Sequence, residues 1–288
     1  MGPEAGAKRE FMKPCDLGVD ALAPTAARTI TRNMSVDASG TPSLLLQLSG
    51  NGAGGLALVG MRDAPGTALH GTERALHGTE RVDCALDKRG NVARLFAAER
   101  RTLADQRPER VAEFARGRAC ARRALLAVGL RPTPILMGAD GEPLWPDTVV
   151  GSISHTPGYT CALVARGLDA VGVDVERYDR ELSPRAWRLI LSGAELQGEG
   201  QREQVAVFGI KEAFFKLAWP STRRRFGFTA VRVCLFGPGR GCEVRLVEAL
   251  SGAFRRGATF FGNYVYGRGF ALAWFCTPPG GQQVASWR

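Results

Sequence analysis

Several hallmarks of common protein classes are missing from this 288-residue sequence. Its seven cysteines form no CxxC pair, which argues against a zinc ribbon and against a disulfide scaffold. No apolar run approaches the length of a membrane span, and the N-terminus lacks a secretory hydrophobic region. We therefore expect a cytoplasmic protein without a membrane partner.

Signature motifs of two reaction classes are also absent. No GxxxxGK[ST] segment places the substrate in a P-loop, and no GxSxG segment marks a serine hydrolase. Histidine is scarce, with three in the chain, and His70 and His77 lie in the duplicated heptapeptide ALHGTER of residues 68–81. We interpret this duplication as a local expansion in a surface segment rather than as a metal site.

Positive charge, by contrast, is abundant. The chain has 38 Lys and Arg against 28 Asp and Glu, a net charge of +10, which favours acidic partners such as nucleic acid, phosphorylated small molecules or an acidic protein. The arginines of residues 94–123 do not indicate nucleic acid, because the important ones lie in an apolar stripe without interleaved aromatic residues.

The pattern along the chain predicts an α+β fold. Residues 1–40 are rich in Ala, Gly, Pro and Thr without periodicity, which predicts a disordered leader, and Met34 is an alternative start. Helical periodicity begins at Leu95, and short strands and helices then follow in mixed order. Such an order is typical of largely antiparallel sheets packed with helices.

Two neighbouring carboxylates stand out in the segment VGVDVE, residues 171–176. Its three valines alternate with Gly172, Asp174 and Glu176, the period of a half-buried strand. Both acids then share one face, and no Lys or Arg among the six residues neutralises them. Because like charges repel, we expect a cation between the two carboxylates.

A second unusual charge lies in the predicted helix 110–126. Its apolar stripe of Val111, Phe114, Ala121 and Leu125 contains Arg118. A guanidinium in such a stripe needs an anion beside it. A structural carboxylate, a snorkelling side chain and a bound phosphate all remain open at this point.

The helix VAVFGIKEAFFKLAW, residues 205–219, is apolar almost all round and is therefore expected to be buried. Its polar notch holds Glu212 and Lys216 beside Gly209, and Lys211 lies at the edge. An ordinary i,i+4 salt bridge is the plain alternative for this pair.

Together these residues predict a divalent cation site with phosphate-binding groups around it. Asp174, Glu176 and Glu212 offer the hard oxygen ligands that suit Mg²⁺ or Mn²⁺. Ser154 and His155 end the strand VVGSISH shortly before the acidic strand. Mg²⁺ bridging a pyrophosphate is the usual use of such a mixture.

At these residues the chain resembles the 4′-phosphopantetheinyl transferases of the surfactin-synthetase and enterobactin-synthetase type. The resemblance covers about residues 95–276 and rests on several motifs in the same order rather than on VDVE alone. The motifs are RVAEFARGRACARRAL, GADGEPLWPD, GSISH, VGVDVE and KEAFFKLAW.

The resemblance implies a pseudo-twofold protein of two similar α+β halves, each a small antiparallel sheet packed with a long helix, with coenzyme A between them. We expect the N-terminal half at 41–170, with a variable segment at 60–94, and the C-terminal half at 171–288. The activity that the resemblance implies is the Mg²⁺-dependent transfer of 4′-phosphopantetheine from coenzyme A to a serine of acyl or peptidyl carrier protein domains. We expect the chain to act as a monomer.

The resemblance also implies roles for individual residues. Asp174, Glu176 and Glu212 would bind the metal, and Glu212 and Lys216 would take part in catalysis. The implied contacts to coenzyme A are Arg110, Arg118, Ser154, His155, Lys211 and Lys216.

The chain departs from the family pattern at two positions. Met137 stands where relatives often have a basic residue, and Gly209 stands where Ser is common. Another Mg²⁺-dependent pyrophosphate-cleaving enzyme and a homologue of low activity are the alternatives.

Overall fold

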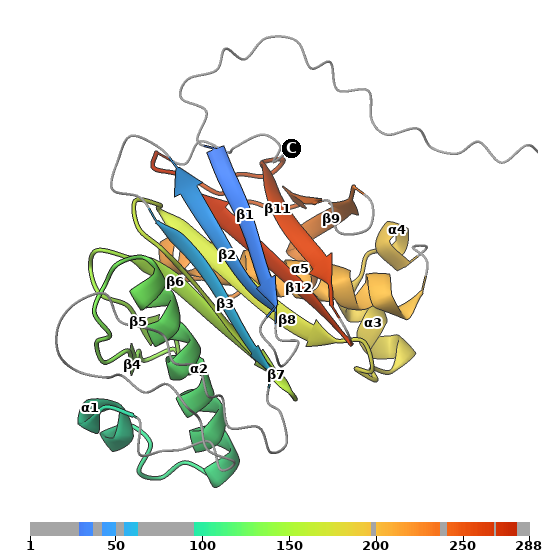
Figure 1. The fold of residues 1–288 in the computed structure, drawn as a ribbon. Coiled ribbons are helices and arrows are strands. Elements are labelled where there is room, and N and C mark those ends of the chain that lie inside the picture. The colour runs from blue at the N-terminus through green and yellow to red at the C-terminus, as the bar shows by residue number, and fades with distance from the viewer. Residues whose placement is uncertain are drawn as a thin grey trace, which may run out of the picture.

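The structure is a computed structural model that describes residues 29–36, 42–49, 55–62, 95–196, 200–236, 241–267 and 269–280. Two sheet-plus-helix units make up most of this part of the chain (Figure 1), so the expected α+β architecture with two halves is confirmed. No helix within the described ranges has the length and hydrophobicity needed to cross a membrane.

The first unit is a three-stranded antiparallel sheet with the strand order β3-β7-β6. Its strands are β3 (Leu56–Arg62), β7 (Tyr159–Ala165) and β6 (Val150–Thr156). The long helix α2 (Pro108–Ala127) packs on this sheet through an apolar cluster that includes Cys120, Leu125 and Val164. The short helix α1 (Ala97–Arg101) and the small hairpin of β4 (Leu136–Met137) and β5 (Pro143–Leu144) complete the unit.

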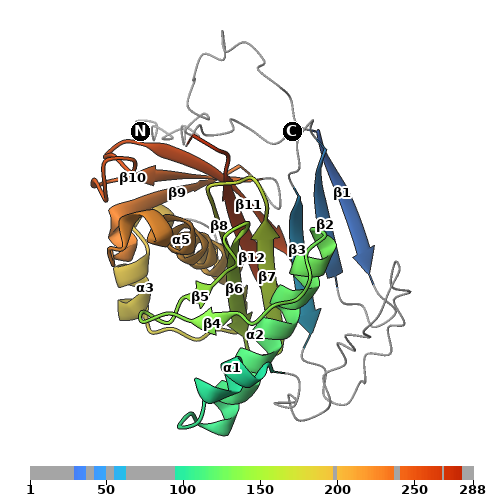
Figure 2. The same cartoon turned by 90° about the vertical axis from the view of Figure 1, so that its left-hand side faces the viewer.

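The second unit is a five-stranded antiparallel sheet with the order β8-β12-β11-β10-β9. Its strands are β8 (Ala170–Arg177), β9 (Val231–Leu235), β10 (Cys242–Leu246), β11 (Thr259–Tyr266) and β12 (Phe270–Thr277). Helix α5 (Gln201–Thr222) lies against this sheet (Figure 2) and buries Phe214 among four other phenylalanines. Helices α3 (Pro184–Ile190) and α4 (Gly193–Leu196) and the 3-10 turn η2 (Phe228–Ala230) flank α5.

The two units meet where β6 runs beside β8. Here serine hydroxyls take the place of backbone partners: Ser152 Oγ accepts from Val173 N at 3.1 Å and Ser154 Oγ accepts from Val175 N at 3.4 Å. Apolar side chains of both units, among them Leu163 and Trp274, share one cluster next to this contact. The acidic strand is therefore held between the halves.

Strand β8 is more deeply buried than its alternating sequence predicts. The alternation predicts a half-buried strand, whereas Val171 through Glu176 are all buried. The valines face the shared apolar cluster, while α5 covers the other face. Gly172 permits this contact, because a Cβ built there would lie 2.0 Å from the carbonyl oxygen of Ala213 in α5.

Part of the N-terminal region differs from the prediction. Residues 29–36, within the expected leader 1–40, form strand β1 (Thr29–Val36), which pairs antiparallel with β2 (Pro42–Ser49). Backbone pairing with β2 satisfies hydrogen bonds that a leader would leave to water. Residues 1–28 and the ALHGTER duplication lie outside the described residues, as does most of the predicted variable segment 60–94.

We predict that Gly172→Ala destabilises the fold by about 1–3 kcal/mol or more, because the added methyl group cannot fit against the α5 backbone. The free energy of unfolding from urea titration measures this change. Gly193→Ala is the matched control, since its Cβ would meet nothing within 4 Å. An equal, small effect of both substitutions would show that α5 does not approach β8 as described.

Candidate active site

Asp174 lies at the centre of the candidate site, on the face of β8 that α5 covers. This residue is 4% exposed, and its partner in the β8–β12 register is Ala273, while Glu176 lies opposite Ala271. Gly209 of α5 adds no side chain at this point: a Cβ there would be 3.5 Å from Asp174 Oδ2 and 3.8 Å from Glu176 Cγ. Small residues thus surround the two carboxylates on both sides.

One oxygen of Asp174 is fully engaged and the other is not. Oδ1 accepts a hydrogen bond from Ser154 Oγ at 2.6 Å and one from Lys216 Nζ at 2.7 Å. Lys216 Nζ also donates to the carbonyl oxygen of Val173 at 3.2 Å. Oδ2 is buried and has no hydrogen-bond partner among the described residues. A buried, charged oxygen without a partner is costly, so this atom is suited to receive a ligand.

The other two carboxylates share the electrostatic environment of Asp174. Burial and the charge of Asp174 raise the pKa of Glu176 to about 7, although Arg180 Nη1 donates to Glu176 Oε2 at 2.7 Å. Burial and the charge of Asp174 also raise the pKa of Glu212. Burial and the neighbouring Asp174 charge thus disfavour the ionised forms of both carboxyl groups, and a cation bound beside them would favour these forms.

Two basic side chains of the protein, Lys216 and Arg180, partly balance the negative charge of the carboxylates. An i,i+4 salt bridge between Lys216 and Glu212 was the plain alternative for this pair, but the ammonium group of Lys216 contacts Asp174 across the helix–strand interface. Burial acts to lower the pKa of Lys216, but the Asp174 carboxylate outweighs it and raises the pKa overall. Arg180, four residues after Glu176, was not identified from the sequence.

The acidic residues fit a divalent cation in chemistry but are not gathered into a closed ligand set. Within the described ranges, no group of three or more Asp, Glu, His or Cys side chains lies close enough together to hold a metal ion. Hard carboxylate oxygens, the unpaired Asp174 Oδ2 and the mutual repulsion of the acids nevertheless suit Mg²⁺. We conclude that the residues present fit the metal.

His155 lies beside Ser154 at the end of β6, facing the start of α2. Its Nε2 is 3.2 Å from Glu113 Oε2, and Arg110 Nη1 is 3.4 Å from the same oxygen. Burial lowers the pKa of His155, the charges of Arg110 and Lys216 act in the same direction, and Glu113 opposes them. The structure therefore places Arg110 and His155 on one carboxylate, that of Glu113, whereas the Ser154 side chain points to Asp174 from the other face of β6. The contacts of these residues to coenzyme A remain predictions.

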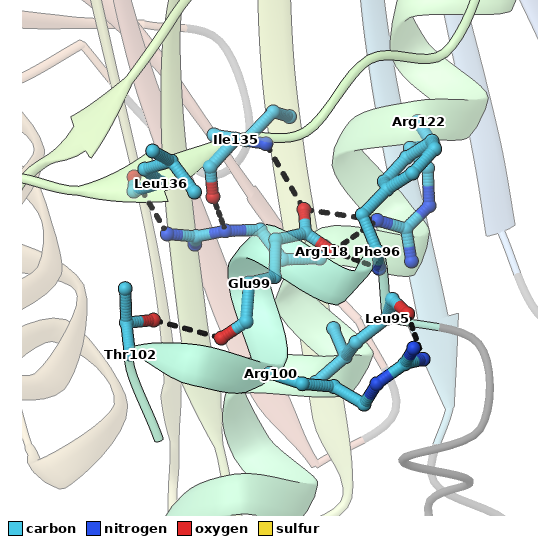
Figure 3. A network of polar contacts seen from close by, with 9 residues as sticks. All are labelled: Leu95, Phe96, Glu99, Arg100, Thr102, Arg118, Arg122, Ile135 and Leu136. Carbon is cyan, nitrogen blue, oxygen red and sulfur yellow. Dashed lines mark hydrogen bonds and ion pairs between the residues drawn. The ribbon is translucent and has the colours of Figure 1, made fainter. Parts of the chain in front are cut away.

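Arg118 is part of a buried polar network at the base of the β4–β5 hairpin (Figure 3). It is 6% exposed, and its Nε and Nη2 donate to the carbonyl oxygens of Ile135 at 2.6 Å and Leu136 at 3.2 Å. Its guanidinium also lies 3.9 Å from the ring centre of Phe114. Burial lowers the pKa of Arg118 to about 10.

Glu99 of α1 is the anion of this network. Its side chain is fully buried and accepts from Arg122 Nη1, from Ile135 N and from Phe96 N. Of the roles that the sequence left open for Arg118, the two hydrogen bonds to main-chain carbonyls support a structural one. The phosphate contact implied by the family resemblance stays a prediction.

The prediction for Lys211 is wrong. This side chain is 1% exposed, and its ammonium group donates to Glu195 Oε2 at 2.8 Å and to the carbonyl oxygens of Ile190, Phe228 and Val231. Five residues along a helix correspond to about 140°, so Lys211 and Lys216 leave α5 on different sides. Lys211 therefore ties α5 to α4 and to the start of β9 instead of reaching a substrate.

Two protein-family models match the chain in succession, one in each unit. The 4′-phosphopantetheinyl transferase N-terminal domain model matches residues 98–165, and the 4′-phosphopantetheinyl transferase superfamily model matches residues 170–269. The chain is 38% identical over 149 residues to 4′-phosphopantetheinyl transferase Svp of Streptomyces mobaraensis, covering 48% of this chain and 59% of that protein. It is 35% identical over 147 residues to 4′-phosphopantetheinyl transferase PptT of Mycobacterium tuberculosis, covering 48% of this chain and 64% of that protein.

A shorter match is 44% identical over 69 residues to enterobactin synthase component D of Salmonella typhi, covering 24% of this chain and 28% of that protein. The chain thus spans less than two thirds of the length of these relatives. With both family models matched in succession and an α+β fold of two halves, the chain belongs to the 4′-phosphopantetheinyl transferase superfamily.

We predict that Lys211→Met lowers the free energy of unfolding by about 3–5 kcal/mol, because it leaves the buried Glu195 carboxylate without its cation. Chemical denaturation measures the loss, and Arg188→Met on the exposed side of α3 is the control. Unchanged stability together with weaker binding of coenzyme A would instead place Lys211 in the substrate site.

Proposed function

We propose that this protein transfers 4′-phosphopantetheine from coenzyme A to a serine of acyl or peptidyl carrier protein domains and releases adenosine 3′,5′-bisphosphate. The observation that carries the proposal is Asp174, buried with one unpaired oxygen between Ser154 of the first unit and Lys216 of the second. Membership in the superfamily supports the same reaction. We further propose that the chain acts as a cytoplasmic monomer.

The proposed metal is Mg²⁺, held by Asp174, Glu176 and Glu212. When bound, it would neutralise the pyrophosphate of coenzyme A during the reaction. Gly209 leaves room beside Asp174 Oδ2, so the helix does not obstruct this side of the carboxylate. Mn²⁺ would satisfy the same oxygen ligands.

The reaction needs few covalent contributions from the protein, because phosphoryl-type transfer depends mainly on positioning and charge. The serine oxygen of the carrier bonds to the phosphorus that bears pantetheine, and the bond from this phosphorus to the bridging oxygen breaks. Glu212, partly exposed beside Asp174, would accept the serine proton. Lys216, Arg110 and His155 would bind phosphate oxygens, with Ser154 holding Asp174 in place.

Mass spectrometry of an apo carrier protein incubated with this protein, coenzyme A and Mg²⁺ tests the proposal. We expect the carrier to gain one phosphopantetheine group, and the gain to disappear when Mg²⁺ is chelated. Cleavage of coenzyme A without any carrier, leaving the carrier unmodified, would show a hydrolase instead.

We predict that Asp174→Asn loses nearly all transfer but keeps the thermal transition of the wild type. The amide retains an oxygen that accepts from Ser154 and Lys216, but it removes the charge that the metal requires. Asp105→Asn, an exposed position between α1 and α2, is the control for a neutralised carboxylate. Transfer at the wild-type rate in the Asp174 variant would refute the metal assignment.

A further inference from the structure

The carboxylate of Glu113 occupies the donors of two residues proposed to bind a phosphate group. Its Oε2 atom lies 3.2 Å from His155 Nε2 and 3.4 Å from Arg110 Nη1. The three side chains are between 33% and 43% exposed, so solvent reaches all of them. Glu113 belongs to neither the acidic strand nor the polar notch of α5, so its carboxylate is not one of the proposed metal ligands.

Close packing of α2 on β6 fixes the position of Glu113. A Cβ built at Gly117 would lie 3.1 Å from Ile153 Cγ2, so the helix backbone approaches the strand tightly at this point. Glu113 precedes Gly117 by about one helical turn, and His155 follows Ile153 by two residues on the same face of β6. The contact between Glu113 and His155 is thus a consequence of how the helix meets the strand.

The charges around His155 are mainly positive. Arg110 and Lys216 both act on this imidazole, and Glu113 is the anion that opposes them. A phosphate group has more charge and more acceptor atoms than one carboxylate and therefore forms stronger contacts with the same donors. Partly exposed ion pairs such as Arg110–Glu113 contribute little stability, so their exchange for another anion costs little.

We propose that Glu113 is a positioning residue that holds the Arg110–His155 donors until a phosphate group of coenzyme A displaces it. This inference rests on the proposed function, which places coenzyme A at these residues. The carboxylate keeps both donors directed at one point and also repels the bound phosphate. Its net effect is to limit the affinity for coenzyme A and for the released adenosine 3′,5′-bisphosphate, which favours product release.

Calorimetric titration of coenzyme A into wild-type protein and Glu113→Gln, without a carrier protein, tests this role. We expect the variant to bind coenzyme A about three- to tenfold more tightly, since one repulsive charge next to the phosphate is removed. Glu248→Gln, which neutralises the exposed Glu248–Arg224 pair elsewhere, should leave the Kd unchanged. An equal or weaker affinity of the Glu113 variant would overturn the proposal.

Dephospho-coenzyme A identifies the phosphate concerned. If the terminal 3′-phosphate displaces Glu113, the variant gains affinity for coenzyme A but not for dephospho-coenzyme A. If the pyrophosphate does so, both ligands gain. Either result supports the displacement.

The ring signals of His155 separate this inference from the proposed function. The chain has three histidines, and His155→Gln identifies the signal in an NMR spectrum. Titration with inorganic phosphate, the group common to both possible displacing phosphates, should shift this signal in the wild type, and at lower concentration in Glu113→Gln. That result would stand even if no carrier protein were modified, whereas a His155 signal that phosphate does not move would contradict the inference.

Discussion

The hydrogen bonds of Asp174 Oδ1 connect the two units of this protein at one atom. Ser154 reaches this oxygen from β6 of the first unit, and Lys216 reaches it from α5 of the second. Asp174 itself belongs to β8, the edge strand of the second sheet that runs beside β6. The site exists only when both units are folded and in contact. Two packing contacts bring the units together. Helix α5 packs on β8 at Gly172, and β6 binds β8 through the hydroxyl groups of Ser152 and Ser154.

This arrangement concentrates negative charge where burial makes it costly. Lys216 and Arg180 each neutralise one carboxylate, yet the pKa values of Glu176 and Glu212 remain raised by burial and by Asp174. Asp174 Oδ2 lacks a partner within the described part of the chain. Binding of a cation at these buried carboxylates is therefore favourable, because the cation offsets both the cost of their burial and their mutual repulsion.

Local patterns in the sequence predicted which residues lie at the site better than they predicted which side chains contact one another there. Alternation in VGVDVE places Asp174 and Glu176 correctly on one face of a strand, and Gly209 is the gap in α5 that the polar notch indicated. Helical spacing offered Glu212 as one possible partner of Lys216, but the partner is Asp174, because α5 packs closely on β8. Contacts between segments that are distant in the sequence depend on how helices and strands pack, and periodicity within one segment does not predict this packing.

The same limit explains why the partners of Arg118 and Lys211 were not found from the sequence. A guanidinium in an apolar stripe correctly indicated a buried anion nearby, but Glu99 lies in a short helix with no pattern that links it to α2. Lys211 was placed at the edge of the notch, and its true partner Glu195 comes from another helix. The i,i+3 spacing of Arg110 and Glu113 was a signal in the sequence, and it would have identified Glu113.

Binding of Mn²⁺, followed by electron paramagnetic resonance, tests most directly whether these buried carboxylates form a cation site. The account predicts that the wild-type chain binds Mn²⁺ without coenzyme A or carrier protein. It also predicts that Asp174→Asn, which removes the charge but keeps the shape of the side chain, weakens Mn²⁺ binding by about tenfold or more. The reason is the loss of a charged oxygen ligand. Equal Mn²⁺ affinity of the two proteins would contradict it.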